Sequence, residues 1–549
     1  MTAATATVTR SRTRTEPRAL AGLGALLGFM VRRDRIRLPA WALGLGSFAV
    51  YVSVAIPAVY TTEEDLQAVT SMLADPMGRL LIGPGYGFDA PTYDRIITGG
   101  YGLYLLLLVA LMSILTVVRH TRVEEQTGRA ELVRASVVGR HTPLTAALIV
   151  TTLTNLATAV VVGAVLIGIG GFGVAGSLLM ATSLLATGLA FAGVGAVAAQ
   201  LSEYSRAASG LAGAVLGAAF VLRAGGDMAT EGGNLLSWLS PLGWAQQSAP
   251  FVLDRWWPLL LLVALAAVTT VAGYALSTRR DLAASLFAAR SGRPRAHPSL
   301  GTPLGLAARL QRTATIAWTI ALAVSGLVFG AFTDVMSGTV DDLPEAFLEL
   351  FGAEEALAGY LGYMAVFMGY FVAVYAILAV QGLANEEARG RAEPLLSTPL
   401  SRRSWLGTNV AVTAAGVVTI LAATGAATGT GAWIVTGDAS YLWDLTAAHL
   451  NQAPAVLVVL GLATLAFGLA PRAVPATWAV VAYALIAGTF GRLLDLPQVA
   501  LGLSPFDHAA EIPLEAFAVV PVVVLTAISL ALITGGLVAF RRRPITAGG

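Results

Sequence analysis

The chain has 549 residues, of which 56% are hydrophobic and 12% are charged, and its formal net charge is +2 at pH 7. Soluble domains carry about 25% charged residues, so this composition excludes a soluble protein and favours a membrane protein with many spans. The absence of cysteine excludes disulfides and thiolate sites, and the five histidines lack the spacing of a zinc site. We therefore expect no catalytic site and no metal site, and no nucleic-acid partner.

Twelve apolar stretches along the chain are each long enough to cross a bilayer. The predicted spans are residues 38–60, 97–118, 143–168, 172–200, 206–223, 257–276, 314–333, 357–380, 404–434, 450–470, 474–491 and 518–540. No Asp, Glu, Arg or His lies well inside any of these spans. The predicted fold class is all-α, a polytopic membrane protein of twelve transmembrane helices.

The segment before the first span is apolar over residues 19–31 and follows several arginines, a pattern that a signal peptide also shows. The sequence RRDR at residues 32–35 follows directly, and no small-residue cleavage site is evident. We therefore favour an amphipathic elbow helix in the membrane interface. Residues 304–312 are the predicted counterpart in the second half.

Two longer loops carry signals for short helices outside the membrane. Residues 61–65 read TTEED, a hydroxyl cap followed by acids in the first helical turn, and Pro76 and the GPG sequence at 83–85 interrupt the rest of that loop. Residues 341–352 (DDLPEAFLELFG) show the same features in the second half. We expect short extracytoplasmic helices in both loops.

A short charged sequence occurs twice, 262 residues apart, each time directly after an apolar span. Residues 124–131 read EEQTGRAE and residues 386–393 read EEARGRAE, with an arginine nine residues after each final glutamate (Arg140 and Arg402). The sequence LSP at residues 239–241 also recurs, at 503–505. Such spacing indicates duplication of a six-span unit. Because the number of spans per unit is even, the two repeats are expected to be parallel.

The distribution of basic residues sets the predicted orientation. The segment 277–313 carries seven Arg and one acid, whereas 334–356 carries seven acids and no Arg. Both termini are therefore expected in the cytoplasm of a multi-pass cell-membrane protein. The predicted divisions are a cytoplasmic N-terminus with its elbow helix (1–37), a first six-helix half (38–276), a basic cytoplasmic linker with the second elbow helix (277–313), a second six-helix half (314–540) and a cytoplasmic tail (541–549).

On a continuous helix, Glu125 and Arg129 would pair at i, i+4, and so would Glu387 and Arg391. Glu124 and Glu131 would then be free to project together, and Gly128 would allow close approach of another backbone. Pro394 would interrupt the helix of the second copy and make the two halves unequal. The alternative is a solvated helix beside the membrane with no partner; recurrence of the pattern favours docking of a partner protein.

The chain contains no Lys, so it cannot supply the lysine that a P-loop uses to reach the β- and γ-phosphates of ATP. The charged repeat after the second span of each half resembles the ABC-2 type permeases. Its fused twelve-span form resembles the actinobacterial exporters of polyketide antibiotics (tetronasin type). The stretches SPLGWAQQ at 240–247 and SPFDHA at 504–509 add to the resemblance, which covers essentially the whole chain.

The resemblance implies the permease subunit of an ATP-driven multidrug exporter, with two copies of a separate nucleotide-binding ATPase subunit docked on the repeats. ATP and Mg would then be bound by the partner, and this chain would hold no cofactor. The implied docking residues are Glu124, Glu125, Gly128, Arg129 and Glu131, with Glu386, Glu387, Gly390, Arg391 and Glu393. The implied cargo is small, hydrophobic or amphiphilic compounds such as drugs and polyketide-like antibiotics.

One face of the eighth span carries aromatic and Met side chains at helical spacing, and the second span carries a sparser set. The residues are Tyr360, Met364, Phe367, Phe371 and Tyr375, with Tyr101, Tyr104 and Met112. The resemblance places these spans along the central path, where such side chains suit bulky amphiphiles. Ordinary helix packing is the alternative for this face.

Two other classes of function stay open. Twelve spans in two halves also fit an ion-coupled secondary transporter, although uncharged spans leave little to titrate. A lipid exporter is a further possibility. A membrane enzyme would need a polar cluster, and Asp507, His508 and Glu511 form the one such cluster that the sequence offers.

Overall fold

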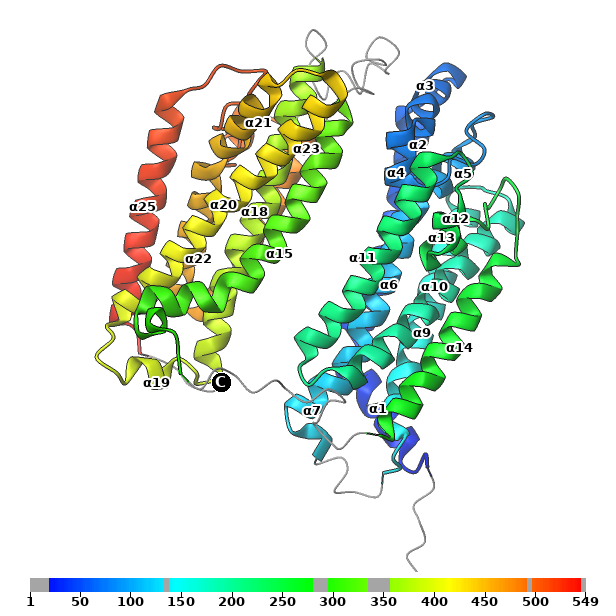
Figure 1. The fold of residues 1–549 in the computed structure, drawn as a ribbon, viewed down its shortest axis with the longest axis horizontal. Coiled ribbons are helices and arrows are strands. Elements are labelled where there is room, and N and C mark those ends of the chain that lie inside the picture. The colour runs from blue at the N-terminus through cyan, green and yellow to red at the C-terminus, as the bar shows by residue number, and fades with distance from the viewer. Residues whose placement is uncertain (1–18, 132–137, 280–294, 334–355, 491–495, 545–549) are drawn as a thin grey trace, which may run out of the picture. The chain divides into compact units, whose positions relative to one another are not determined.

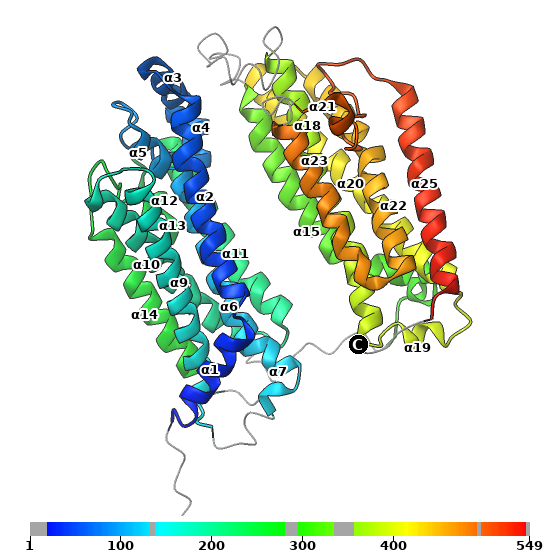
Figure 2. The same cartoon turned by 180° about the vertical axis from the view of Figure 1, so that it is seen from behind.

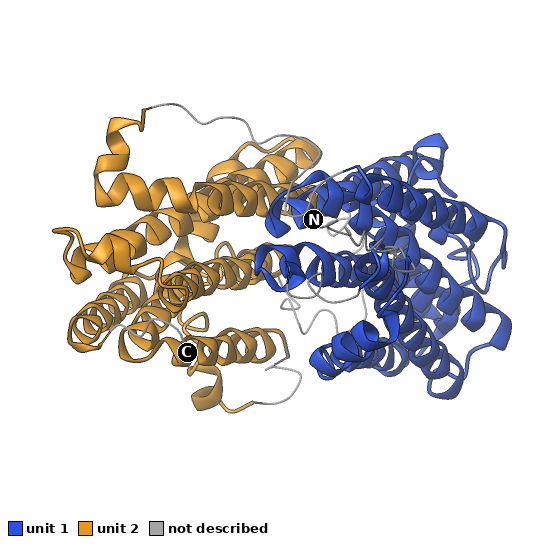
Figure 3. Ribbon diagram, turned by 90° about the horizontal axis from the view of Figure 1, so that it is seen from below, with its two compact units in different colours: residues 1–291 blue, residues 292–549 orange. Residues whose placement is uncertain are grey.

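A computed structural model describes residues 19–131, 138–279, 295–333, 356–490 and 496–544. Twelve helices in these residues are long and apolar enough to cross a membrane. The chain divides into two compact units, Met1–Ser291 and Gly292–Gly549, and each contains six of the twelve spans (Figure 3). The prediction of an all-α polytopic membrane protein with twelve spans is confirmed.

The first unit is a bundle of six spans (Figure 1). Its spans are α2 (Arg37–Val59), the rod from α5 to α7 (Tyr93–Gln126), α9 (Thr142–Gly168), α10 (Val174–Leu201), α11 (Ser205–Ala229) and α14 (Pro258–Ser277). Its shorter helices are α1 (Leu23–Arg33), α3 (Glu63–Ala74), α4 (Pro76–Ile82), α12 (Leu235–Trp238) and α13 (Pro241–Gln246). The rod of the second span consists of α5 (Tyr93–Ile96), η1 (Ile97–Tyr101), α6 (Gly102–Val118), η2 (Arg119–Val123) and α7 (Glu124–Gln126), of which η1 and η2 are π-helical.

The second unit is built in the same way. Its spans are α15 (Pro303–Ala331), α18 (Ala356–Ala388), α20 (Arg402–Thr436), α21 with α22 (Ser440–Asn451 and Ala453–Leu469), η5 with α23 (Pro471–Thr477 and Trp478–Phe490) and α25 (Val519–Arg542). Its shorter helices are η3 (Pro298–Gly301), α19 (Glu393–Leu396) and α24 (Gln498–Leu501). A buried apolar core joins residues of α18, α20, α22 and α25.

Helix starts follow the signals in the sequence. The side chain of Thr62 accepts a hydrogen bond from the backbone N–H of Asp65, and the carboxylate of Asp65 accepts one from the backbone of Thr62, so α3 begins with a capping box. Pro76 then begins α4, with Asp75 as its cap. The predicted short helix at 341–352 lies outside the described residues.

Small residues bring the helices of each unit together. A Cβ atom added to Gly330 of α15 would lie 1.9 Å from the carbonyl oxygen of Thr428 on α20. Only glycine permits this distance, so α15 and α20 pack backbone to backbone. The hydrophobic effect contributes little to helix association within lipid, so close van der Waals contacts of this kind stabilise the bundle.

Several span boundaries differ from those predicted. The fifth span continues to Ala229, the tenth begins at Ser440, and the seventh joins the predicted elbow segment 304–312 in the single helix α15. The predicted second elbow segment therefore continues into the seventh span without a break, because no helix-breaking residue separates the two, and its position in the membrane interface stays a prediction. The first two extensions place Asp227 and His449 within helices that span the bundle, and Arg223, the last residue of the predicted fifth span, now lies inside α11. The expectation of uncharged spans is therefore wrong.

Candidate functional site

The two copies of the charged repeat lie at the ends of long helices. The first copy begins with α7, at the same end of its unit as α1 (Figure 2), and the second begins in the last turn of α18, next to α19. In both copies the two glutamates are helical and a glycine follows. The duplication in sequence is therefore also a duplication in local structure.

Each repeat contains a helix end at its glycine. Gly128 has φ +73° and Gly390 has φ +69°, the left-handed conformation in which helices commonly end. In the second copy the N–H of Arg391 donates to the carbonyl of Glu386, and the N–H of Gly390 donates to that of Glu387, which is a Schellman motif. No heavy atom within the described residues lies within 4 Å of a Cβ built on either glycine. Gly128 thus terminates a helix, and close approach of a partner's backbone at this open position stays a prediction.

The first two acids of the first copy are held by arginines. Arg33, at the end of α1, pairs with Glu124. Arg122 pairs with Glu125 at 2.8 Å, and its Nε donates to the carbonyl of Ala199 on α10 at 2.9 Å. We expected Arg129 as the partner of Glu125, but Arg129 follows the turn at Gly128 and no longer lies on the same helix. The expectation that Glu124 is free is also wrong, because Arg33 of α1 is its partner.

In the second copy the corresponding pair is made by the C-terminal segment. Arg543 binds the buried carboxylate of Glu387 with two hydrogen bonds of 2.6 and 2.7 Å. Its guanidinium also lies over the rings of Phe467 and Phe540, 5.4 and 5.3 Å from their centroids. Arg391, expected to pair with Glu387, pairs instead with Glu386 at 2.7 Å, because the Schellman turn brings it back over that residue.

The arginine that follows each repeat has the same role in both units. Arg140 donates to the carbonyl of Thr278 at 2.5 Å, and Arg402 donates to the carbonyl of Arg543 at 2.6 Å. Thr278 and Arg543 are the C-cap residues of α14 and α25, the last span of each unit. An arginine near a helix C-terminus satisfies unpaired carbonyls and the helix dipole. The sequence showed the repeated spacing of this arginine but not its partner.

The elbow helix is joined to the second span through Asp34, which is buried between α1 and α2. Its carboxylate accepts hydrogen bonds of 2.8 and 2.9 Å from Arg119, and Nε2 of His120 lies 3.1 Å from it. Burial alone would raise the pKa of Asp34, but the hydrogen bond from Arg119 and the charges of His120, Arg119 and Arg33 outweigh it and lower the pKa. Two ionic contacts, at Asp34 and Glu124, thus hold α1 against the base of the first repeat.

The charged residues after each glycine remain on the surface of their unit. Arg129 and Glu131 are exposed in the first copy, and Arg391 and Glu393 are exposed in the second. Pro394 occupies the first turn of α19, so it begins a short helix, whereas the interruption expected at Pro394 already lies at Gly390. Leu132, which stands in the first copy where Pro394 stands in the second, lies outside the described residues. The ten predicted docking residues are therefore four glutamates held in ion pairs, two glycines that end helices, and one exposed Arg and one exposed Glu in each copy.

The aromatic face of the second and eighth spans divides between core and surface. Met112, Met364, Tyr360 and Tyr375 are buried, and the hydroxyl of Tyr360 donates to the carbonyl of Phe329 at 2.9 Å. Tyr101 is partly buried, and Tyr104 is 41% exposed. Phe367 stacks edge-to-face with Phe371, which is 39% exposed. The predicted substrate path stays a prediction, with Tyr101, Tyr104, Phe367 and Phe371 as its surface members.

Three buried polar residues were not found from the sequence. Arg223 and Asp227 of α11 pair at 3.4 Å, and Arg223 also donates to the carbonyl of Leu80 in α4 at 2.6 Å. His449 is buried in α21, with Nδ1 2.8 Å from the carbonyl of Leu445. Hydropathy ended the fifth predicted span at Arg223 and began the tenth at residue 450, which left Asp227 and His449 outside the predicted spans and Arg223 at the edge of one.

Comparison with known proteins places this arrangement in a family. The sequence matches the family described as "Multidrug efflux system permease Rv1217c, C-terminal domain" over residues 23–276 and 300–541. The chain belongs to this family of multidrug efflux permeases. The multidrug efflux system permease protein Rv1217c of Mycobacterium tuberculosis is 37% identical over 536 residues, which cover 95% of each chain. Together with the twelve spans, this membership makes the chain a multi-pass membrane permease, a transport protein of the efflux class.

Proposed function

We propose that this permease is the membrane subunit of an ABC-2 type exporter, similar to the tetronasin-type antibiotic exporters. It moves hydrophobic or amphiphilic compounds out of the cell, and separate ATPase subunits that bind ATP and Mg supply the energy. The efflux function named for the Mycobacterium tuberculosis relative supports the export of drugs. The observation that supports ATP as the energy source is the exposed Arg and Glu that recur after the glycine turn of each repeat, where an ATPase subunit could dock.

The anchored glutamates support a mechanical role for the repeat. Glu124 is paired with Arg33 of the elbow helix, and Glu387 is paired with Arg543 at the end of α25. A displacement of the exposed residues would therefore be transmitted to α1 in the first unit and to α25 in the second. The exposed residues Arg129, Glu131, Arg391 and Glu393 would contact the ATPase, and the anchored ones would transmit its movement. With both termini and both repeats in the cytoplasm, each unit would bind one ATPase subunit.

The test is association of the purified chain with a Walker-type ATPase encoded next to it. We expect a stable complex whose ATPase activity rises with the permease present. Reversing one charge at each site, with Glu131→Arg and Glu393→Arg combined, should weaken association about tenfold or more, because like charges would then face each other. Co-purification and ATP turnover in detergent measure both effects.

A matched control is Glu231→Arg, the same reversal at an exposed glutamate between α11 and α12. This loop lies at the end of the first unit opposite α7 (Figure 1), so association should not change. Equal loss in the control and the repeat variants, or full association of the repeat variants, would contradict docking at the repeats.

An ion-coupled secondary transporter is the second candidate. The buried His449 favours it, because an ionisable group inside a span is costly and often marks a proton path. The backbone hydrogen bond of Nδ1 and the tight packing of α21 against α20 also suit a structural histidine, since a Cβ on Gly425 would lie 3.0 Å from Cβ of His449. A lipid exporter differs from our proposal in cargo and not in energy source.

A further inference from the structure

The corner where α1 meets α2 carries a cluster of positive charge. Arg32, Arg35 and Arg37 lie close together in this corner, and all three are exposed. None of their side chains makes a hydrogen bond or an ion pair with another residue that the structure describes. Asp34 is the one acid in residues 19–41, and its carboxylate already binds Arg119. The corner therefore presents three positive charges without a partner in the described part of the chain.

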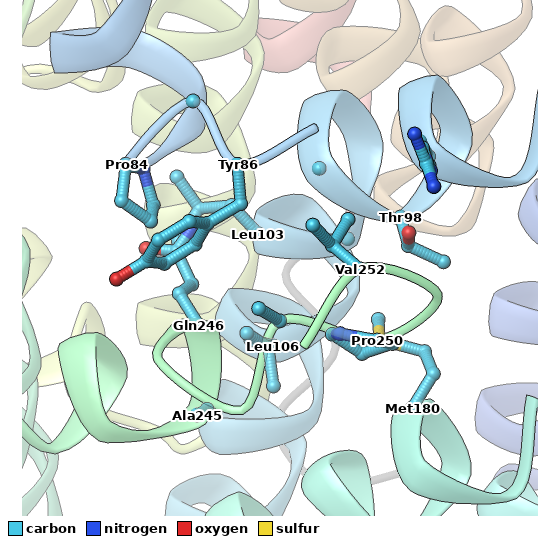
Figure 4. A pocket seen from close by; sticks show the side chains of 15 residues that line it. Pro84, Tyr86, Thr98, Leu103, Leu106, Met180, Ala245, Gln246, Pro250 and Val252 are labelled. Atoms are coloured by element: carbon cyan, nitrogen blue, oxygen red, sulfur yellow. The ribbon is translucent and has the colours of Figure 1, made fainter. Parts of the chain in front are cut away.

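Arginines at the opposite end of the first unit are used differently (Figure 1). In the described part of that end, each contacts a backbone carbonyl or an aromatic ring of its own unit; they are Arg79, Arg95, Arg223 and Arg255. Arg95 also belongs to the wall of the small cavity in Figure 4, which has room for little more than a water molecule. These side chains stabilise the unit itself, whereas the three at the corner are available to a partner outside the chain.

Large apolar side chains surround the corner arginines. Phe29, Val31 and Ile36 are 52%, 44% and 77% exposed, whereas Met30, on the other face of α1, packs against α9. With 11 residues, α1 is about 16 Å long and cannot cross a hydrocarbon core of about 30 Å. Its outer face therefore suits the membrane interface, where apolar side chains enter the acyl region and basic ones stay among the headgroups.

The charge at the corner favours a negatively charged headgroup. A guanidinium group donates paired hydrogen bonds to phosphate oxygens. Each basic residue close to an anionic membrane surface strengthens binding about fivefold. A zwitterionic headgroup has an ammonium group beside its phosphate, which offsets this attraction. A soluble phosphate compound would gain the charge contacts but would leave Phe29, Val31 and Ile36 in water.

The same corner also holds the first charged repeat. Arg33 pairs with Glu124, and Asp34 pairs with Arg119, so both residues connect the corner to the end of the second span. That end is π-helical at η2, a rare geometry that is often found at functional sites. Figure 2 shows α1 and α7 at the same end of the unit. A partner that fixes the corner would therefore also fix the beginning of the first repeat.

We propose that the corner between α1 and α2 binds the headgroups of anionic phospholipids, and that this contact holds the first repeat in position. Arg32, Arg35 and Arg37 donate hydrogen bonds to the phosphates, and the side chains of Phe29 and Ile36 lie among the acyl chains. The effect on docking of an ATPase rests on the proposed function. Lipid binding itself requires neither ATP nor the ATPase.

The first test measures which lipid the purified full-length chain retains. The chain is equilibrated in detergent with equal amounts of phosphatidylglycerol and phosphatidylcholine, and the bound lipids are counted by native mass spectrometry. We expect about tenfold more phosphatidylglycerol than phosphatidylcholine on the unaltered chain. The combined variant Arg32→Gln, Arg35→Gln and Arg37→Gln should lower this preference to about twofold or less, because the charge that attracts the headgroup is gone.

The matched control removes the same charge from three exposed arginines in separate parts of the chain. It combines Arg206→Gln, Arg279→Gln and Arg472→Gln. This variant should keep the preference for phosphatidylglycerol. Equal loss in both variants would reduce the effect to overall charge. Equal retention of the two lipids by the unaltered chain would leave the corner arginines a role in membrane insertion alone. Either result, or an undiminished preference in the corner variant, would overturn the proposal.

A second measurement tests the connection to the repeat. Hydrogen exchange at residues 124–131 should be about threefold slower in nanodiscs with equal parts of phosphatidylglycerol and phosphatidylcholine than in phosphatidylcholine alone. Glu124→Gln removes the ion pair with Arg33, so it should keep the lipid preference and lose most of this slowing. Glycerophosphoglycerol, the soluble headgroup without acyl chains, should not slow exchange. Slowing by the soluble compound would overturn the assignment to lipid, and exchange that ignores phosphatidylglycerol would overturn the connection to the repeat.

The outcome is separate from that of the docking test. A preference for phosphatidylglycerol in a chain that never associates with an ATPase would keep the lipid surface and overturn the proposed energy source. Association and ATP turnover without any lipid preference would do the reverse.

Discussion

Arginine makes several of the long-range polar contacts among the described residues, and the sequence has no Lys. Arg122 and Arg223 are fully buried, and each donates to a backbone carbonyl of a neighbouring helix. Arg543 binds the carboxylate of Glu387, lies over two aromatic rings and is the C-cap residue of α25. The planar guanidinium, with five donors, suits such shared sites better than an ammonium group.

The buried pair in α11 gives a prediction on stability. Arg223→Met would leave Asp227 buried without its charge partner and would release α4, so we expect a loss of about 3 kcal/mol in unfolding free energy. Arg206→Met changes an exposed arginine of the same helix and should have little effect. Thermal unfolding in detergent measures both. Equal melting temperatures for the two variants would show that the pair does not hold α4.

The contact at Asp34 predicts a dependence on pH. Because the folded state lowers the pKa of Asp34, its contribution to stability is present above the ordinary Asp pKa of about 3.9 and is lost as pH falls through the lowered pKa. Asp34→Asn should therefore lower the melting temperature at pH 6. It should also reduce the drop in melting temperature between pH 6 and pH 3. A variant whose melting temperature falls as steeply as that of the unaltered chain would exclude Asp34 as a source of this dependence.

At the scale of elements, each repeat is a helix end followed by a short exposed segment. The spans themselves could be predicted closely, since long apolar runs specify transmembrane helices almost without reference to the rest of the fold. The helix ends at Gly128 and Gly390 could not, because a glycine is tolerated within a helix and its φ depends on the path of the residues after it. The partners of Glu124 and Glu387 could not either, because Arg33 and Arg543 are 91 and 156 residues away.

Substitution of the two glycines tests this geometry. Gly128→Ala and Gly390→Ala should each cost about 1 kcal/mol, because φ near +70° is unfavourable for alanine while open space surrounds both positions. Gly217→Ala, in the interior of α11 with equal space around it, should be neutral or stabilising by up to about 1 kcal/mol. Hydrogen exchange and thermal unfolding report the difference. Stabilisation at all three sites would mean that the repeats are continuous helices.

At the scale of the whole molecule, the two units share an architecture but differ in how they hold their repeat. The elbow helix and Arg122 hold the first, and the C-terminal Arg543 holds the second. The sequence indicated an asymmetry at Pro394, whereas the structure shows it in these partners. A C-terminal truncation before Arg543 should therefore loosen only the second repeat, seen as faster hydrogen exchange at residues 386–393 with no change at 124–131.

The central claim is that ATP drives export through this permease, and the direct measurement is uptake of ethidium by inverted membrane vesicles that contain the chain and its neighbouring ATPase. We expect accumulation that requires hydrolysable ATP and persists when ionophores for protons and for sodium remove both gradients. Accumulation driven by an imposed pH gradient without ATP, and lost in a His449→Asn variant that still folds, would contradict the account and identify a proton-coupled transporter.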